Sequence, residues 1–370
     1  MYDQLFEPWT LPVSGVVLPN RLALAPMTTY SSTEDGTITD DEVDYLRRRA
    51  AGGLGTIITA ACYVERVGQG FVGQWGCDDD RHGPSLARVA AAIRAEGAVA
   101  LLQIHDAGRM SDLAVVAAPR APSAVPAERS NAPTPRAMTE DEIHASIAAF
   151  AAAARRAMQA GYHGVEIHGA NTYLIQQFFS PHSNRRDDAW GGDIARRLRY
   201  PLAVAQAVRA AVGTSGVVGY RFSPEETEQP GISLDDTLVL LDHLAALHLD
   251  YLHISLGDYA RGSIREPQDT RRRTPLVAAH VAGRLPLMTV GSIETPDQAL
   301  ESLADGAALV ALGRAALWEP EWPAKVREGR VSELRRALPA HDGDIICTLP
   351  RPLYQRILNR PGWVKVASDS

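Results

Sequence analysis

The sequence predicts an α/β protein built as a single (β/α)₈ barrel, also called a TIM barrel. Short apolar segments recur eight times along the chain, longer amphipathic segments alternate with them, and the short segments are continuously apolar rather than alternating. Parallel strands that are buried on both faces have this continuous pattern, and strands that alternate with helices form parallel sheets. A doubly wound open sheet is the alternative that the same pattern allows.

The predicted strands extend from residue 21 to residue 312. They cover residues 21–25, 56–60, 98–104, 164–168, 217–222, 251–255, 285–290 and 309–312. Ahead of the first strand, residues 11–19 contain two short apolar runs around Ser14-Gly15. This arrangement predicts an N-terminal β-hairpin that acts as a lid on the bottom of the barrel.

Capping residues mark where several helices begin. A threonine followed three residues later by Glu or Gln has the spacing of a capping box. Three such pairs precede apolar periodic segments: Thr39 and Glu42, Thr139 and Glu142, and Thr295 and Gln298. They predict helices that begin next to each threonine, and amphipathic periodicity predicts two more helices over residues 197–212 and 234–247.

Two connections are too long for simple turns. Residues 106–138, after the third strand, contain five prolines, and residues 257–273, after the sixth, contain five arginines. Long loops in compact domains are commonly lids or binding loops. No linker or change of composition interrupts the chain. We therefore expect one domain over residues 1–370, with the barrel core at about 21–330 and a C-terminal extension at 331–370.

Charge and composition argue against several classes of function. The chain has 37 Lys and Arg residues against 44 Asp and Glu, a net charge of −7, so nucleic acid and anionic membranes are not expected partners. Its three cysteines lie far apart without a CxxC spacing, and we expect no metal or iron–sulfur site. The sequence shows no signal-peptide pattern and no bilayer-length apolar run, which favours a cytoplasmic location.

Candidate functional residues follow the predicted strands at their carboxyl ends, where barrel enzymes carry their active sites. The richest group is His168, Asn171 and Tyr173, after the fourth strand. Imidazole and amide groups donate hydrogen bonds to a carbonyl or phenolate oxygen while neutral, and a phenol delivers a proton without being ionised. The alternative is that these polar side chains only form hydrogen bonds with backbone groups at the end of the strand. Three such groups within six residues favour a functional role instead.

Glycines follow the seventh and eighth strands, in Gly291-Ser292 and Gly313-Arg314. Free backbone N–H groups with a bidentate guanidinium form the usual phosphate site of a barrel, although tight turns would explain the glycines equally well. The absence of GxGxxG after the first strand disfavours a Rossmann-bound dinucleotide. Motifs of serine hydrolases, HExxH metalloenzymes and retaining glycosidases are also missing.

Three motifs follow one another along the chain: Leu18-Pro-Asn-Arg-Leu-Ala-Leu-Ala-Pro-Met27, Gln103-Ile-His-Asp-Ala-Gly-Arg109, and the run from His168 to Pro181 with Ser183-Asn-Arg185 and Gly191-Gly192. In this order they resemble the motifs of the Old Yellow Enzyme family of FMN-dependent ene-reductases. The resemblance extends from about Leu5 to Arg314, and beyond Trp318 only Pro361-Gly362-Trp363 matches, loosely. It implies a barrel with non-covalent FMN that passes hydride from NADH or NADPH to the β-carbon of an α,β-unsaturated carbonyl compound or another activated alkene.

The resemblance also implies roles for individual residues. The flavin ring and ribityl chain would contact Pro26, Met27, Thr28, Ala61, Gln103 and Arg221, and the phosphate would be held by Gly291, Ser292, Gly313 and Arg314. His168 and Asn171 would bind the substrate oxygen, and Tyr173 would donate the proton to the α-carbon. Tyr30 or Trp75 would supply the aromatic side chain of the substrate loop. Arg221 would stabilise negative charge on the reduced ring, and Thr28 would tune its potential through a hydrogen bond.

The sequence departs from the family pattern at two positions. Thr172 stands where the family commonly has glycine before the tyrosine, so its side chain could change the backbone that carries Tyr173. Trp190 stands where the family usually has tyrosine before Gly-Gly. The sequence leaves the oligomeric state open, and the arginines of residues 257–273 could either contact a nicotinamide nucleotide or form a solvated loop.

Three alternative functions remain at this stage. The first is a dehydrogenase or demethylase built on the same flavin barrel. The second is a flavin-binding storage or sensor protein without turnover. The third is a non-redox, phosphate-binding lyase. A lyase of the Schiff-base type would need a lysine at a strand end, and the only lysines, Lys325 and Lys365, both follow the eighth strand.

Overall fold

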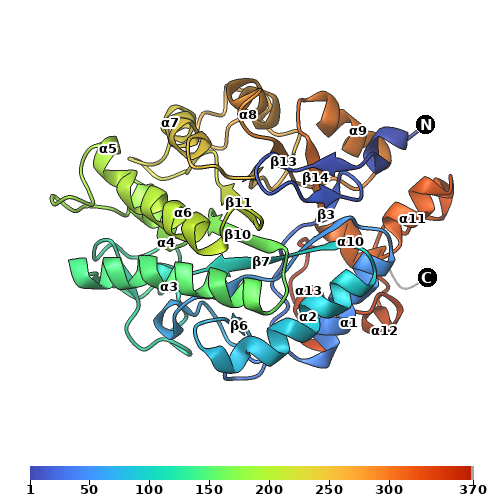
Figure 1. Ribbon diagram of the computed structural model, residues 1–370, viewed down its shortest axis with the longest axis horizontal. Coiled ribbons are helices and arrows are strands. Elements are labelled where there is room, and N and C mark those ends of the chain that lie inside the picture. Colours follow the sequence, from blue (N-terminus) through green and yellow to red (C-terminus); the bar gives the residue numbers. More distant parts are fainter. Residues whose placement is uncertain (368–370) are drawn as a thin grey trace.

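The computed structural model describes residues 1–367 and contains the closed, eight-stranded parallel barrel that the sequence predicts (Figure 1). The barrel strands are β3 (Leu22–Leu24), β4 (Thr56–Ile58), β7 (Val99–His105), β10 (Gly164–Gly169), β11 (Val217–Phe222), β12 (Tyr251–Ile254), β13 (Leu287–Thr289) and β14 (Leu309–Leu312). Each pairs in parallel with the next, and β14 pairs with β3 to close the sheet. All eight predicted strands are present, with small differences at their ends.

The longer helices pack around the outside of the barrel (Figure 1). They are α1 (Asp40–Ala51), α2 (Gly83–Ala95), α3 (Glu140–Gln159), α6 (Arg199–Val212), α7 (Leu234–Ala245), α8 (Arg273–Val281) and α9 (Pro296–Ala304). The three predicted capping boxes are formed, at Thr39, Thr139 and Thr295. The sequence analysis did not predict α2 and α8, and neither has a side-chain cap at its start.

Shorter helices and strands lie between and after these elements. The helices are α4 (Leu174–Phe179), α5 (Ile194–Arg197), α10 (Arg314–Trp318), α11 (Trp322–Arg327), α12 (Gly343–Ile346) and α13 (Arg351–Leu358). The short strands are β1 (Trp9–Thr10), β2 (Val17–Leu18), β5 (Cys62–Tyr63), β6 (Trp75–Gly76), β8 (Arg120–Ala121) and β9 (Arg136–Ala137). Among residues 1–367, no helix combines the length and the apolar character that crossing a membrane requires.

Two apolar cores hold the barrel together, one inside the sheet and one between the sheet and the helices. Leu101 on β7 and Val217 on β11 belong to the inner core. Side chains of a strand alternate between its two faces, so Gln103 and His105 lie on the same inner face as Leu101, and Arg221 lies on the same face as Val217. Polar residues at the carboxyl ends of different strands therefore converge inside one end of the barrel.

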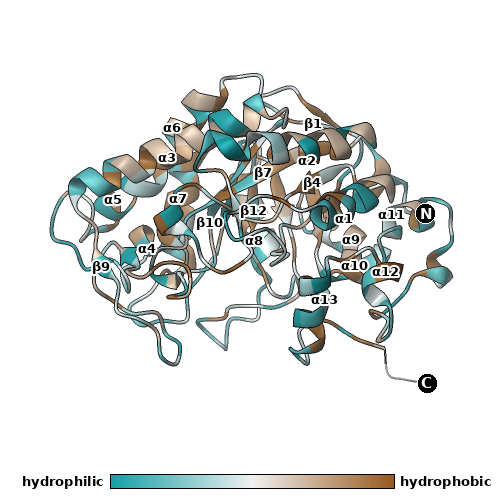
Figure 2. Ribbon diagram, turned by 90° about the horizontal axis from the view of Figure 1, so that it is seen from below, coloured by the Kyte–Doolittle hydropathy of each residue, from teal (hydrophilic) through white to brown (hydrophobic). Residues whose placement is uncertain are grey.

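The hairpin is present and is formed by β1 and β2, which pair antiparallel, although β1 lies just before the predicted residues 11–19. Leu11 and Leu18 pack into the inner core, and the backbone N–H of Ser14 donates to Oδ1 of Asp250 at 2.8 Å. Asp250 directly precedes β12, so the hairpin covers the amino ends of the strands. In Figure 2, β1 lies near the top of the molecule and α13 lies near the bottom.

The arginines of the loop after β12 form internal ion pairs. Arg272 pairs with Glu301 and Asp305, both at 2.6 Å. Arg273 is buried and pairs with Glu225 at 3.3 Å. These contacts hold Arg272 and Arg273 against the barrel, whereas Arg261 and Arg271 of the same loop are exposed.

Candidate active site

His168, at the end of β10, is a neutral hydrogen-bond donor. It is only 5% exposed, and its Nδ1 accepts the backbone N–H of Ala170 at 3.4 Å. This contact places the ring proton on Nε2. Burial, together with the neighbouring His105 and Arg221, lowers the pKa of His168 well below its ordinary value. The ring can therefore donate from Nε2 without carrying a charge.

The amide of Asn171 is oriented by its neighbours. Its Oδ1 accepts the hydroxyl proton of Ser255 at 2.9 Å, and the Ser255 oxygen accepts from Nη2 of Arg221 at 3.1 Å. This chain of hydrogen bonds leaves Nδ2 of Asn171 free to donate. The sequence analysis missed Ser255, which lies two residues after His253 on β12. The two-residue period of the strand could have identified it.

Tyr173 lies beside two imidazole rings. Its ring centroid is 5.0 Å from that of His168 and 4.3 Å from that of His105, and both pairs are close to perpendicular. Burial and the nearby Tyr30 raise the pKa of Tyr173, so the phenol keeps its proton at neutral pH. The structure thus brings a proton-bearing hydroxyl next to the neutral donor His168.

Thr172 adopts the backbone conformation that glycine adopts freely. Its φ is +64°, and that of Asn171 is +58°. A β-branched residue is strained in this left-handed region. The departure from the family pattern therefore leaves the turn before Tyr173 in the left-handed form, at a cost in stability.

Replacing Thr172 by glycine is expected to stabilise the protein by about 1 kcal/mol, because relief of strain exceeds the entropy that glycine loses on folding. Urea unfolding of Thr172→Gly measures the change. Thr270→Gly is the matched control, since this exposed loop threonine has no positive φ and should lose stability. If both substitutions lowered the free energy of unfolding equally, the backbone of Thr172 would not be strained.

Arg221 and Gln103 present unpaired polar atoms inside the barrel. Arg221 is 8% exposed, and its buried Nε has no partner among the described residues. Nε2 of Gln103 donates to Oε1 of Glu166 at 2.7 Å, which leaves the amide oxygen of Gln103 as an acceptor. Glu166 is held in turn by Tyr251 and His253, both at 2.9 Å. A free donor beside a free acceptor fits the polar edge of a flavin ring.

The residues after β13 and β14 meet where the phosphate is expected. Arg314 donates to Oγ of Ser292 and, at 3.3 Å, to the carbonyl of Gly257. A Cβ on Gly291 would lie 2.8 Å from the backbone nitrogen of Tyr259, so only glycine fits there. A Cβ on Gly313 would meet nothing closer than 3.8 Å. Open space beside a guanidinium and a hydroxyl fits a phosphate group.

The remaining predicted residues differ in their surroundings. Pro26, Met27 and Thr28 follow β3 and are partly exposed, and Thr28 makes no side-chain hydrogen bond within residues 1–367. Ala61 follows β4 and is also partly exposed. Gly313 and Met27 are neighbours, since the nearest atoms to a Cβ on Gly313 include the Met27 sulfur.

Of the two candidate aromatic residues, the structure favours Tyr30. Its ring lies 4.9 Å from that of Phe71, and the guanidinium of Arg356 on α13 stacks on it at 4.0 Å. Trp75 is fully buried, and its Nε1 donates to Glu42 at 2.7 Å. Trp75 therefore belongs to the core and is unsuited to a substrate loop.

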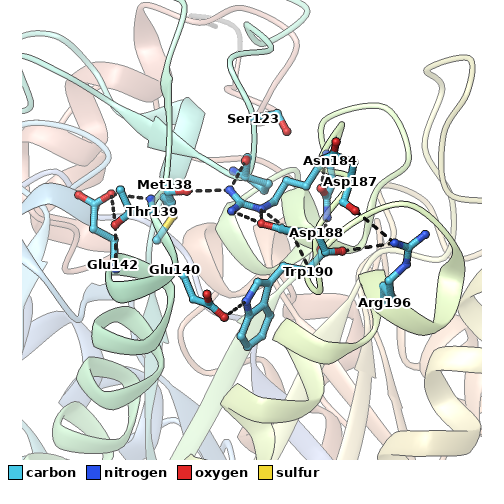
Figure 3. A network of polar contacts seen from close by, with 12 residues as sticks. Ser123, Met138, Thr139, Glu140, Glu142, Asn184, Asp187, Asp188, Trp190 and Arg196 are labelled. Carbon is cyan, nitrogen blue, oxygen red and sulfur yellow. Dashed lines mark hydrogen bonds and ion pairs between the residues drawn. The ribbon is translucent and has the colours of Figure 1, made fainter.

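Asn184 and Trp190, which lie in the third motif region, form hydrogen bonds that connect neighbouring segments of the chain (Figure 3). Nδ2 of Asn184 donates to the backbone oxygens of Phe178 and Trp190, both at 2.7 Å. The indole Nε1 of Trp190 donates to Glu140 on α3 at 3.5 Å. Tryptophan at this position therefore joins two surface segments, and its contacts do not include the candidate site residues.

The free energy of unfolding is expected to decrease as the pH falls below about 6.5. Burial lowers the pKa of His105 to about 3, and that of His168 also lies well below its ordinary value. In the unfolded chain both residues titrate near 6.5, so the unfolded state binds more protons and gains about 1.4 kcal/mol per histidine for each pH unit below that value.

Urea unfolding at a series of pH values measures this slope. His105→Phe removes one of the groups with a lowered pKa and should reduce the slope, and His144→Phe, at an exposed position, is the control variant. Identical slopes in wild type and His105→Phe would show that His105 titrates normally in the folded state.

Comparison with known proteins relates the whole chain to flavin enzymes. Residues 4–333 match the model of the NADH:flavin oxidoreductase / NADH oxidase family. The chain is 43% identical over 369 residues to the probable NADH-dependent flavin oxidoreductase YqiG of Bacillus subtilis (strain 168), and the match covers 98% of each. It is 45% identical over 344 residues to NADH:fumarate oxidoreductase of Klebsiella pneumoniae (strain 342), covering 90% of this chain but only 37% of that protein.

A solved structure supports the same relationship. The Old Yellow Enzyme homologue from Zymomonas mobilis superposes with a TM-score of 0.79 at 26% sequence identity. The superposition covers 88% of this chain and 92% of the other.

Proposed function

Because the chain belongs to the NADH:flavin oxidoreductase / NADH oxidase family, it is an oxidoreductase with FMN as cofactor, and we propose that it reduces the activated C=C bond of α,β-unsaturated carbonyl compounds. The observation that carries this proposal is the cluster of His168 and Tyr173, in which a neutral donor lies beside a phenol that keeps its proton. Family membership also overturns the alternative of a non-redox lyase.

The residues that would hold FMN follow from the free polar atoms and open space described above. Gln103 and Arg221 would bind the polar edge of the ring, Thr28 would donate to a ring oxygen, and Pro26, Met27 and Ala61 would line its faces. Gly291, Ser292, Gly313 and Arg314 would hold the phosphate. When bound, FMN accepts hydride from NADH or NADPH and delivers it to the substrate. The buried charge of Arg221 favours negative charge on the ring.

The substrate oxygen would lie between His168 and Asn171. Nε2–H of His168 and Nδ2–H of Asn171 would donate to this oxygen and stabilise the negative charge that grows on it as hydride reaches the β-carbon. Oη of Tyr173 would then give its proton to the α-carbon. Hydride and proton together add two hydrogens across the double bond, and solvent returns a proton to the phenolate.

The names of relatives support this class of substrate. One relative is an NADH:fumarate oxidoreductase and another an NADH:acrylate oxidoreductase, and both fumarate and acrylate contain a C=C bond next to a carboxylate. The chain spans 37% and 32% of these two proteins, so the likeness concerns one segment of each.

The purified protein is expected to be yellow, to release FMN on denaturation in a ratio of about one per chain, and to oxidise NADH or NADPH in the presence of cyclohexenone. Absorbance of the released flavin, chromatography against FMN and FAD, and product analysis measure these properties. Flavin retained on the denatured chain, FAD in place of FMN, or nicotinamide oxidation without any saturated ketone would contradict the proposal.

A further inference from the structure

We propose that His105 is a positioning residue for Tyr173 and that Gln74 holds it in a single tautomer. The inference rests on the proposed function, because it concerns the support of the proposed proton donor. The sequence analysis assigned no role to either residue. His105 lies in one of the motifs that carry the family resemblance, but the resemblance implied no role for it or for Gln74.

Gln74 can be oriented without ambiguity from its contacts. Its Oε1 accepts the backbone N–H of Gly70 at 2.6 Å, so its Nε2 is the donor. Nε2 lies 3.1 Å from the carbonyl of Ala61 and 3.0 Å from Nδ1 of His105. Since Nδ1 accepts this hydrogen bond, the ring proton of His105 is on Nε2. Gln74 is 1% exposed, which protects the arrangement from water.

The ring of His105 packs against the phenol ring of Tyr173. His105 is fully buried. The centroid of its ring lies 4.3 Å from that of Tyr173, with an angle of 80° between the ring planes, and 5.4 Å from the ring centroid of His168. Its Nε2 is buried and has no acceptor among the described residues. Perpendicular packing of two aromatic rings is favourable and fixes their mutual orientation. The position of the Tyr173 ring is therefore determined partly by His105.

The surroundings of His105 also keep it neutral. The groups that face it are Gln74, His168 and Tyr173, none of which carries negative charge at neutral pH. The carboxylate of the adjacent Asp106 pairs instead with Arg120 at 3.0 Å. Burial lowers the pKa of His105 to about 3. The proton donor therefore has a neighbour whose charge is constant over the working pH range.

Gln74 connects His105 to the rest of the candidate site. It binds the carbonyl of Ala61, a residue expected at the flavin, and the N–H of Gly70, which precedes Phe71. Phe71 in turn packs on Tyr30 at the rim. One buried amide thus fixes the positions of the flavin-side backbone, the rim loop and the support of Tyr173 relative to one another.

A double-mutant cycle tests the proposal. The rate of alkene reduction is measured in the pre-reduced holoenzyme for wild type, His105→Ala, Tyr173→Phe and the double variant. We expect His105→Ala to slow the wild type at least about tenfold, since small displacements of a catalytic group have large effects on rate. In the Tyr173→Phe background the same substitution should have almost no effect. Additive losses would overturn the positioning role.

The cycle also separates this inference from the proposed function. If Tyr173→Phe alone retains the wild-type rate, Tyr173 is not the proton donor, and both proposals fail. If Tyr173→Phe is slow but the losses are additive, only the role of His105 is wrong. His105→Phe keeps a ring in place and should restore most of the rate lost in His105→Ala, which also covers the case in which the alanine variant does not fold.

The tautomer has its own test. In Gln74→Glu a carboxylate faces Nδ1 of His105, which favours a proton on Nδ1 and a positive charge on the imidazole next to the phenol. We expect a new ionisation between about pH 5 and 8 in the pH profile of alkene reduction. Gln69→Glu is the matched control, a buried glutamine whose amide instead binds the carbonyl of Phe71. A profile of Gln74→Glu identical to that of the control would overturn the assignment.

Discussion

Replacement of Tyr173 by phenylalanine is expected to slow alkene reduction by about 10²–10⁴-fold, the usual effect of removing a positioned general acid. Reduction of the bound flavin by NADH or NADPH should be unchanged, because that step does not use the phenol. The slower alkene reduction is expected from the environment of Tyr173. Burial raises the pKa of Tyr173, so its hydroxyl holds its proton at neutral pH, and the neutral His168 lies beside it. The loss should be smaller for strongly activated nitroalkenes, whose carbanions survive until water protonates them.

Rapid mixing separates the two steps. One experiment mixes oxidised enzyme with nicotinamide, and the other mixes pre-reduced enzyme with cyclohexenone, and both follow flavin absorbance. Tyr162→Phe is the control, because Tyr162 is a buried tyrosine whose hydroxyl has no partner among residues 1–367. An unaltered rate with cyclohexenone in Tyr173→Phe would remove Tyr173 from the mechanism and indicate solvent or Tyr30 as the proton source.

His168→Ala and Asn171→Ala are each expected to raise the barrier to alkene reduction by about 2–4 kcal/mol, the typical effect of losing one donor to a developing oxyanion. Both variants should also bind phenols more weakly, since a phenolate oxygen uses the same donors. His168 is 5% exposed whereas Asn171 is exposed, and a hydrogen bond is stronger in the less polar interior. The loss should therefore be greater for His168→Ala.

Titration with a para-substituted phenol, followed through its charge-transfer absorbance, measures binding, and turnover with cyclohexenone measures the barrier. His144→Ala serves as a control at an exposed position on α3. If both site variants retain wild-type turnover and phenol spectra, the substrate oxygen binds elsewhere.

The barrel could be predicted because its signals are local. Continuous apolar runs identify strands buried on both faces, and the three capping boxes identify helix starts through residues three apart. The helices α2 and α8 lack a capping side chain, and the sequence analysis missed both. Their position is determined instead by packing against neighbouring elements, which a local pattern does not contain.

The candidate site was predicted in part for the same reason. His168, Asn171 and Tyr173 follow one strand, and strand ends converge in a barrel whatever the details of the loops. Gln74 and Ser255 were missed, since their importance lies in contacts with His105 and Asn171, which are far from them in the sequence.

By itself, the sequence determined the order of the strands, the end of the barrel at which the candidate site is proposed and the chemical groups available there. Only the tertiary structure showed that Trp75 is bonded to Glu42 in the core while Tyr30 packs on Phe71, that Thr172 is in the left-handed conformation, and which ring nitrogens of His105 and His168 carry the proton. The physical reason is that protonation and orientation depend on burial and on partners within about 3 Å, and folding brings these partners together from distant parts of the chain.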